Sequence, residues 1–408
     1  HPGGSLLAAG HDSGMMVFKL SRERPAYAAS SGQVFYVKSG YLRRHVLGSV
    51  TDVPVVGLRR SARQSVGYGP RTLVLNPYNN TEDNLLLHST AEGGLYYLFC
   101  LNQVQNDHEP MKGRGVAAAV FLRRNRFITL DSKFQELVVR SLSNEIRKRM
   151  RSPLPRCDML FTARTAARVL LRNDEKVALF EPDSRRVLGE VFAARVKYVV
   201  WNQDGSMVAL LSKTAVTICS RDLELLCSVQ ESVRVKSGVW DAEGVFVYTT
   251  HTHIKYVLPI KSADVGIVRT LPDVVYAVEA SGDTLHCLNR SAKPIALSID
   301  RTEYLFKLAL AKQKWDVVMR TVRSGRLCGQ AVIGYLQNMG YPEVALHFVE
   351  RQEGEAWVQY CRYCASSVGG GERELYVPSL CGVLVLWCLV LWRVGTVVCG
   401  VISPACRC

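Results

Sequence analysis

The sequence VKYVVWNQDGSMVALL at residues 196–211 returns as VKSGVWDAEGVFVY at residues 235–248, and this repetition decides the fold. Trp201 and Trp240 occupy the same place in the two copies, 39 residues apart. Each copy reads as an apolar strand, a polar turn with a glycine (Gly205 or Gly244) where positive φ is favoured, and a second apolar strand. A repeat of about 40 residues built from short strands is typical of the blades of a β-propeller.

Weaker copies of the same unit extend the series in both directions. Each has an apolar residue directly before a polar turn, and these residues are Ala28, Leu75, Phe121, Phe161, Trp201, Trp240 and Val278. From Leu75 onward the successive spacings are 46, 40, 40, 39 and 38 residues. The seven units predict a mainly β fold, a seven-bladed β-propeller. An irregular β-sandwich is the alternative, but its turns recur at about 8–12 residues, so the near-constant period favours the propeller.

The residues before the first unit predict a β-hairpin, because two apolar segments flank the turn at 10–14. We interpret residues 1–20 as the end of a preceding propeller, and the opening of the chain inside an apolar strand as a cut through a longer protein. The polar residues 21–26 read as a linker. The propeller domain is therefore predicted to cover residues 21–300.

Two polar interruptions inside the propeller read as loops. Residues 102–115 are rich in Asn, Gln, Asp, Pro and Gly and predict an exposed blade loop. Residues 144–155 include Arg147, Lys148, Arg149 and Arg151. This second segment is interpreted as an inter-strand loop, with a phosphate or lipid contact as the alternative.

After Asp300 the apolar period changes from 2 to 3.6, which predicts short amphipathic helices. Asp300 and Glu303 resemble a capping box, and Gly340 followed by Pro342 can end one helix and begin the next. The predicted apolar stripes are Leu305, Leu308 and Ala309; Trp315, Val318, Met319 and Val322; Val332, Tyr335, Leu336 and Met339; and Val344, Ala345 and Phe348. Residues 301–350 are therefore predicted to start an α-solenoid, whose stripes are buried by stacking on neighbouring helices.

The composition changes again at about residue 351. Residues 351–408 contain seven cysteines but no Lys, Asp, Asn, His, Phe or Met. The apolar stretch 380–403 is long enough to span a bilayer, and a membrane anchor is one interpretation. The interpretation we favour is a non-native end, such as a retained intron or a frame error in the gene model, so that 351–408 is a hydrophobic or disordered tail.

The chain of 408 residues is basic, with a formal net charge of +15. Such a charge indicates anionic partners, which include nucleic acid, anionic lipid and acidic protein. The basic pairs, such as Arg43 with Arg44 and Arg123 with Arg124, are however scattered along predicted loops, which is typical of a solvated surface. Six cysteines precede residue 351 without a pairing pattern, and this favours a reduced, cytosolic protein.

No catalytic, cofactor-binding or metal-binding constellation is predicted, and the chain is not expected to be an enzyme. Phosphate-loop and nucleophile-elbow motifs are absent from the sequence. His251 and His253 could share one face of a strand and hold a metal, but no ligand partners stand at suitable spacing. Three further motifs are isolated and do not indicate a functional site. They are the C-x-x-C motif of Cys361 and Cys364, the catalytic-triad residue types His, Asp and Ser at 11–13, and the glycosylation sequons at Asn79 and Asn289.

Three groups of segments resemble one family, the alpha subunits of coatomer, the coat of COPI vesicles. Residues 8–20 with 22–27 resemble the junction after the first WD-repeat propeller of that family, residues 235–256 resemble its second propeller, and residues 306–310 with 340–349 resemble the entry to its solenoid. The resemblance covers about residues 5–350, and the tail departs from it.

The resemblance implies a structural coat subunit in Golgi-to-ER and intra-Golgi vesicle transport, cytoplasmic and peripheral on Golgi membranes and COPI-coated vesicles. It implies the beta-prime and epsilon subunits of coatomer as partners, and neither nucleic acid nor a small-molecule substrate. The family reads dilysine signals with its first propeller, so no cargo-binding residue is carried over to this chain. The alternative is another propeller and solenoid scaffold that binds nucleic acid or anionic lipid through basic loops.

Overall fold

The computed structural model describes residues 6–19, 24–30, 32–58, 70–78, 84–89, 94–101, 110–131, 133–260, 263–324, 327, 330–341 and 344–345. The chain divides into two compact units, residues 1–304 and 305–408, and each is described by itself.

In its described residues, the first unit contains a two-stranded sheet near the N-terminus and seven larger antiparallel sheets, in which the strands follow one another in chain order. The first three sheets consist of β3 (Tyr27–Ser30), β4 (Gln33–Lys38), β5 (Tyr41–Val46) and β6 (Asp52–Gly57); β7 (Pro70–Leu75), β8 (Asn84–Ser89), β9 (Leu95–Cys100) and β10 (Met111–Arg114); and β11 (Ala118–Arg123), β12 (Arg126–Asp131), β13 (Glu136–Ser141) and β14 (Ile146–Arg151).

The remaining four sheets repeat this plan, although the last contains three strands in the described residues. They consist of β15 (Met159–Thr162), β16 (Val169–Arg172), β17 (Lys176–Glu181) and β18 (Arg186–Phe192); β19 (Tyr198–Trp201), β20 (Met207–Leu211), β21 (Ala215–Ser220) and β22 (Leu225–Gln230); β23 (Ser237–Trp240), β24 (Phe246–Thr249), β25 (His253–Leu258) and β26 (Asp264–Thr270); and β27 (Val275–Ser281), β28 (Thr284–Asn289) and β29 (Pro294–Ser298).

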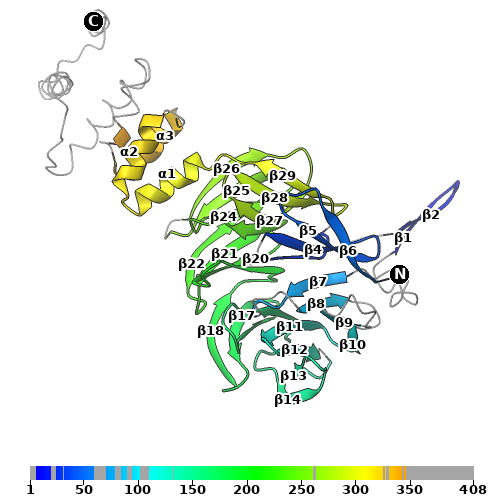
Figure 1. Cartoon of the computed structure of the whole chain (residues 1–408). Helices are drawn as coiled ribbons and strands as arrows, with labels where there is room; N and C mark the ends of the chain where they lie inside the picture. The colour runs from blue at the N-terminus through cyan, green and yellow to red at the C-terminus, as the bar shows by residue number, and fades with distance from the viewer. Residues whose placement is uncertain are drawn as a thin grey trace, which may run out of the picture. The chain divides into compact units, whose positions relative to one another are not determined.

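The seven sheets form a closed ring of blades (Figure 1), and the predicted seven-bladed propeller is confirmed. The ring closes where the first strand of the last sheet, β27, contacts the first strand of the first sheet, β3. All seven residues that mark the predicted repeat lie in the first strand of a sheet, namely Ala28 in β3, Leu75 in β7, Phe121 in β11, Phe161 in β15, Trp201 in β19, Trp240 in β23 and Val278 in β27. The sequence repeat therefore follows the innermost strands of the blades.

The outer strands are where the sequence interpretation was wrong. Residues 146–151, interpreted as part of a loop, form strand β14, and residues 111–114 of the other predicted loop form β10. The fourth strand of a blade lies at the sheet edge, where most of its side chains are exposed, so it lacks the apolar pattern that marks a strand. Basic side chains on such an edge also oppose pairing with other chains. Residues 102–109 lie outside the described residues.

The turns that define the repeat have the predicted glycine conformation, since φ is +71° at Gly205 and +86° at Gly244. The polar residue that follows each tryptophan also shapes its turn. Asn202 Oδ1 accepts a hydrogen bond from the backbone N–H of Met207 (3.0 Å), and Asp241 Oδ1 accepts one from Glu243 (2.5 Å). The Asn or Asp after the tryptophan is therefore part of the turn chemistry of the blade.

The predicted N-terminal hairpin is present as the two-stranded sheet β1 (Leu6–His11) and β2 (Gly14–Lys19), which pairs Leu7 with Phe18. It presents large exposed apolar side chains, which are Leu7, Met15, Met16, Val17 and Phe18. An isolated two-stranded hairpin is marginally stable in water.

The described residues after the last sheet form three helices, as expected at the start of a solenoid: α1 (Thr302–Ala311), α2 (Trp315–Ser324) and α3 (Gln330–Asn338). Their shared core consists of Phe306, Ala309, Leu310, Val318, Val322, Ile333, Leu336, Val344 and Ala345. Gly340, at φ +82°, ends α3 as predicted, and the N–H of Tyr341 donates to the carbonyl of Leu336 (2.9 Å).

The predicted helical stripes are only partly buried. Val318, Val322 and Leu336 are buried, whereas Trp315 and Met339 are 44% and 41% exposed. Both exposed residues lie at or just beyond a helix end, where fewer neighbours can cover them. Most of the predicted fourth helix and the tail 351–408, including the apolar stretch 380–403, lie outside the described residues. Among the helices that the structure describes, none is both long and apolar enough to span a bilayer.

Candidate interaction face of the propeller

One face of the propeller is formed by two kinds of connection. In a blade of chain-ordered antiparallel strands, the turn between the second and third strands lies on the same face as the segment that leads into the next blade. We call this the connector face, and in the third to sixth blades it comprises the turns 133–135, 173–175, 212–214 and 250–252 and the connecting segments 152–158, 193–197, 231–236 and 271–274.

Backbone hydrogen bonds join the two kinds of connection in successive blades. The N–H of Ala193 donates to the carbonyl of Glu175 (3.0 Å), that of Glu231 to Thr214 (2.7 Å), and that of Leu271 to Thr252 (2.7 Å). Each connecting segment is thus held by the turn of the blade that it leaves. The connector face is consequently a regularly hydrogen-bonded surface that fixes the positions of its side chains.

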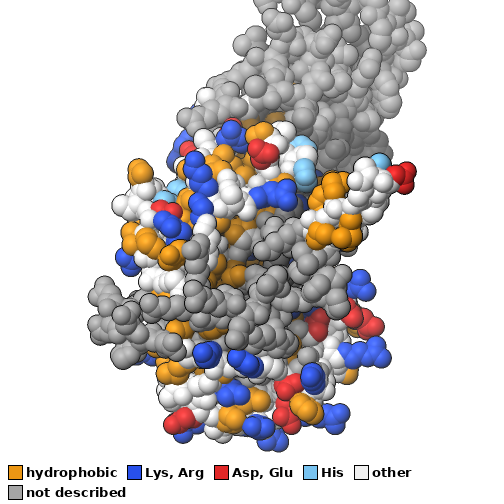
Figure 2. Space-filling view, turned by 90° about the vertical axis from the view of Figure 1, so that its right-hand side faces the viewer, with side chains coloured by type: hydrophobic (Ala, Val, Ile, Leu, Met, Phe, Trp, Pro, Cys, Tyr) orange, Lys and Arg blue, Asp and Glu red, His pale blue; other side chains and the backbone are white. Residues whose placement is uncertain are grey.

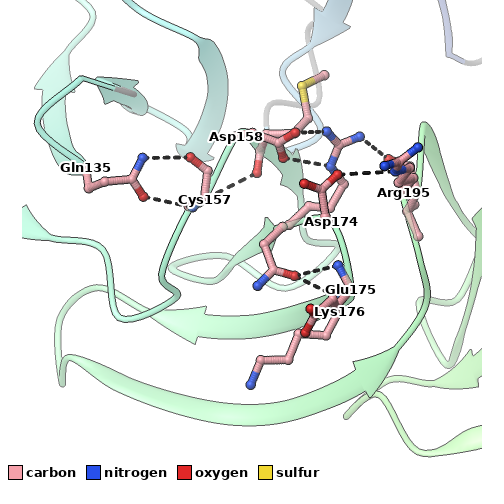
Figure 3. Close-up of polar contacts among 11 residues, drawn as sticks. Gln135, Cys157, Asp158, Asp174, Glu175, Lys176 and Arg195 are labelled. Atoms are coloured by element: carbon pink, nitrogen blue, oxygen red, sulfur yellow. Dashed lines mark hydrogen bonds and ion pairs between the residues drawn. The ribbon is translucent and has the colours of Figure 1, made fainter.

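Side chains add further contacts where the third, fourth and fifth blades meet (Figure 3). Gln135 binds both backbone groups of Cys157, donating to the carbonyl (3.1 Å) and accepting from the N–H (2.8 Å). Arg172 donates through Nε to Asp158 Oδ1 (2.8 Å), and Arg195 lies 3.4 Å from a carboxylate oxygen of Asp174. In this part of the face each of these arginines is matched by a nearby carboxylate.

Arg24 lies on this face although it belongs to the segment interpreted as a linker. Its guanidinium donates to the carbonyl of Lys236 (3.0 Å) and to the hydroxyl of Tyr27 (2.9 Å), and it lies 3.7 Å from the centroid of the Tyr198 ring. Tyr27 in turn donates to the carbonyl of Ala277 (2.7 Å), and burial raises the pKa of its hydroxyl. Arg24 and Tyr27 therefore link the first blade to the last three blades where the ring closes.

A channel of about 680 Å³ runs along the innermost strands of the blades, and Arg24 is one of its lining residues. Arg24 also lines a smaller neighbouring pocket of about 140 Å³. The other lining residues of the smaller pocket are Lys197, Tyr198, Lys213, Arg234, Val235, Lys236 and Tyr276. Among the described residues, five of the side chains that line this pocket are cationic. We call it the basic pocket.

A second polar cluster lies at the end of the first unit. The buried carboxylate of Asp241 accepts hydrogen bonds from the Tyr304 hydroxyl (2.8 Å) and from Arg301 (3.2 Å), whose Nε also donates to Asp283 (2.9 Å). Burial and the charge of Asp241 raise the pKa of Tyr304. This cluster holds Arg301 and Tyr304, at the end of the first unit, against the turns of the sixth and seventh blades and suits a structural role.

The residues considered as metal or catalytic candidates are not brought together. His251 lies in the bend before β25 and His253 is the first residue of that strand, so the expectation that both stand on one strand is wrong. His11 Nδ1 and Ser13 Oγ lie 3.0 Å apart in the exposed hairpin turn, a purely local contact. Asn289 Oδ1 accepts from the N–H groups of Ser291 (3.0 Å) and Lys293 (2.8 Å) and shapes a turn. The described residues contain no group of three or more potential metal ligands.

The scattered basic pairs behave as surface charges. Arg43 pairs with Asp52, and Arg123 pairs with Asp183. In Figure 2, Lys and Arg side chains are spread over the visible face among acidic and apolar ones. Three other residues that the sequence analysis considered, Cys361, Cys364 and Asn79, lie outside the described residues.

The sequence interpretation missed Arg24 and the basic pocket. Arg24 precedes the first repeat, so no periodic signal marks it. The other pocket residues come from the fifth, sixth and seventh blades, and their convergence depends on how the ring closes.

Comparisons with known proteins agree with this architecture. The family model described as COPA/B second beta-propeller matches residues 42–289. The coatomer subunit alpha-2 of Arabidopsis thaliana is 45% identical over 86% of this chain, and the coatomer subunit alpha of Saccharomyces cerevisiae is 33% identical over 86%. The chain spans 28% of the Arabidopsis relative and 29% of the yeast one. A chain in the crystal structure of the mitotic checkpoint complex matches with a TM-score of 0.53 and 11% identity, covering 68% of this chain and 91% of that one, which indicates a shared fold alone.

Proposed function

This chain belongs to the COPA/B second beta-propeller family, and from that premise we propose that it is part of a structural subunit of the coatomer coat. In this role it acts as a scaffold in Golgi-to-ER and intra-Golgi vesicle transport. The observation that carries the proposal is the 45% identity to a coatomer alpha subunit over 86% of the chain.

The architecture supports a scaffold. A closed propeller offers a rigid face for docking, and stacked helices offer surfaces for further helices. Buried polar side chains such as Asp241, Arg301 and Tyr304 form hydrogen bonds with one another. We therefore propose that the chain is not an enzyme and uses no cofactor or small-molecule substrate.

The proposed partners are other coatomer subunits, in particular beta-prime and epsilon, and the proposed location is the cytoplasm and the surface of Golgi membranes and COPI-coated vesicles. We also propose that the hairpin β1–β2 completes a preceding propeller. Its exposed apolar side chains, among them Met15 and Phe18, support this, because neighbouring strands would bury them.

The alternative scaffold, which would bind nucleic acid or anionic lipid through basic loops, has weaker support. Binding to extended phosphate backbones is favoured by basic side chains gathered in a stripe or patch. The basic pairs are instead dispersed, and they are not confined to loops as expected, since Arg43 lies in β5 and Arg123 in β11. Arg43 and Arg123 are already paired with Asp52 and Asp183.

Purification of the tagged chain from cells, followed by mass spectrometry of the recovered proteins, tests the proposal. Other coatomer subunits are the expected result. A Val318→Asp variant is the matched comparison, because it places a charge in the buried helical core and leaves the blades unchanged. If the other coatomer subunits are no longer recovered with this variant, the helices are needed for binding to them. Recovery of the intact chain, with tail peptides from 351–408 and no coatomer subunit, would overturn the coat proposal.

A further inference from the structure

The outer strand of the fifth blade, β22, differs from the outer strands of the other blades. Its sequence is LLCSVQ, and among the fourth strands that the structure describes it is the one without a charged residue. The exposed edge of a sheet is a template for pairing with another chain, and charged side chains on the edge oppose such pairing. The edge of β22 therefore lacks a protection that the other outer strands have.

The hydrogen bonds between β21 and β22 determine which backbone groups of β22 face outward. The N–H of Glu231 donates to the carbonyl of Thr214 (2.7 Å). From there the pairing is regular from Gln230 to Cys227. Because hydrogen-bonded and non-hydrogen-bonded pairs alternate in an antiparallel ladder, Ser228 and Gln230 direct their N–H and C=O groups away from β21. In the described part of the chain, β21 is the only strand paired with β22, and no hydrogen bond reaches these outward groups.

The outward position of Ser228 is charged in the two preceding blades. By the same hydrogen-bond pattern it is Arg149 in β14 and Glu190 in β18, and both side chains are exposed. Two copies of either of these edges, paired antiparallel about this position, would bring like charges directly opposite one another, which is unfavourable. Two copies of the β22 edge bring no like charges together. The charge pattern therefore permits self-pairing at the fifth blade and opposes it at the third and fourth.

Two exposed leucines at the start of β22 add apolar surface to this edge. Leu225 is 58% exposed and Leu226 is 37% exposed. Both lie at the bulge in the pairing of β22 with β21. A strand added to the edge would remove part of this apolar surface from water, which favours association.

We propose that β22 pairs with the β22 strand of a second copy of this chain, antiparallel and centred on Ser228. The two fifth blades then form one continuous sheet across a two-fold axis, which is the commonest symmetry of protein dimers. Ser228 lies opposite the same residue of the second copy, and Leu226 lies opposite Gln230. The outward N–H and C=O groups of each strand are satisfied by those of the other.

A second copy fits this edge because both strands of the pair are uncharged. A partner strand with charged residues would have to place them against an edge that offers no opposite charge. A single pair of short strands is a small interface, so we expect a weak dimer that forms at high protein concentration. The proposal does not depend on a role in the coatomer coat.

Sedimentation velocity of the full chain at increasing protein concentration tests this proposal. We expect a reversible equilibrium between monomer and dimer for the unmodified chain. Ser228→Glu and Ser228→Lys each place like charges opposite one another in the dimer, and each is expected to raise the dissociation constant by about tenfold or more. An equimolar mixture of the two variants brings opposite charges together, so the dimer is expected to return. Thermal melting checks that each variant folds.

Two matched controls change the net charge by the same amounts at the equivalent outward positions of the preceding blades. Arg149→Gln is the control for Ser228→Glu, and Glu190→Gln is the control for Ser228→Lys. Both controls are expected to form the dimer like the unmodified chain. An unmodified chain that stays monomeric at every concentration would overturn the proposal. The proposal also fails if the Ser228 variants dimerise as tightly as the unmodified chain, if the controls weaken the dimer equally, or if the mixture of the two Ser228 variants stays monomeric.

Discussion

At the scale of single residues, the two repeat tryptophans connect neighbouring blades. The indole N–H of Trp201 donates to the carbonyl of Thr162 (2.9 Å), and that of Trp240 donates to the carbonyl of Val200 (2.9 Å). Both acceptors lie in the innermost strand of the preceding blade, 39 and 40 residues earlier. The repeat in the sequence thus corresponds to a hydrogen bond from a tryptophan side chain to the preceding blade, which recurs from one blade to the next.

Truncation of the two tryptophans is expected to have unequal effects. Trp240 is 6% exposed and packs on Phe246, with 5.1 Å between the ring centroids, so Trp240→Ala should lower the free energy of unfolding by about 3–5 kcal/mol. Trp201 is only partly buried because it lines the channel, so Trp201→Ala should cost less. The same place in the repeat therefore does not give the two tryptophans the same burial. Urea denaturation measures both values, and equal losses would contradict the difference in burial.

At the scale of strands, two blades use the same pairing of a tyrosine with a glycine. Tyr96 in β9 lies opposite Gly113 in β10, and Tyr256 in β25 lies opposite Gly266 in β26. A Cβ atom built on either glycine would lie within 2.4 Å of its tyrosine ring. The ring therefore occupies the space over the glycine, and it covers a strand position that has no side chain of its own.

Gly266→Ala is expected to destabilise the sixth blade, because the new methyl group must displace the Tyr256 ring. Overpacking of this kind costs about 1–3 kcal/mol. Gly334→Ala in α3 is the matched control, since a Cβ there meets nothing within 4 Å, and alanine favours the helix by about 1 kcal/mol. Thermal melting of both variants compares them. A Gly266→Ala chain as stable as the unmodified one would show that the tyrosine moves aside without cost.

At the scale of the whole molecule, the propeller core contains thiols that resist ionisation. Burial raises the pKa of Cys219 to about 12, of Cys227 to about 11 and of Cys287 to about 12. All three are free cysteines in the described part of the chain, and they lie in two blades, Cys219 and Cys227 in the fifth and Cys287 in the seventh. Their thiols are therefore protonated and poorly reactive in the folded state at neutral pH.

These thiols make the stability of the chain depend on pH above about 8.5, the ordinary cysteine pKa. Above that value the unfolded state loses thiol protons that the folded state keeps until its raised pKa, so a rise in pH favours unfolding. Each thiol contributes up to about 1.4 kcal/mol per pH unit. Urea denaturation at about pH 7.5 and about pH 9.5 should show the loss. Cys287→Ala should lose less between the two pH values, and an unchanged difference in that variant would contradict this origin.

The sequence alone determined those features of the fold that depend on residues close to one another along the chain. The tryptophan repeat, the turn glycines Gly205 and Gly244, and the change to helical periodicity after Asp300 predicted seven blades followed by helices. Each of these features arises from residues within one strand, turn or helix. They can therefore be predicted without the tertiary structure. The edge strands β10 and β14 escaped prediction because exposure removes the apolar pattern.

The tertiary structure alone decided which side chains meet on the connector face. Arg24 joins Lys197, Lys213, Arg234 and Lys236 only because closure of the ring brings the segment before the first blade against the last three blades. In the sequence these cations are indistinguishable from the dispersed surface charges that surround them. The positions of these basic residues follow no repeat in the sequence. They come together in one pocket only because the ring of blades closes, and no single segment of the chain predicts it.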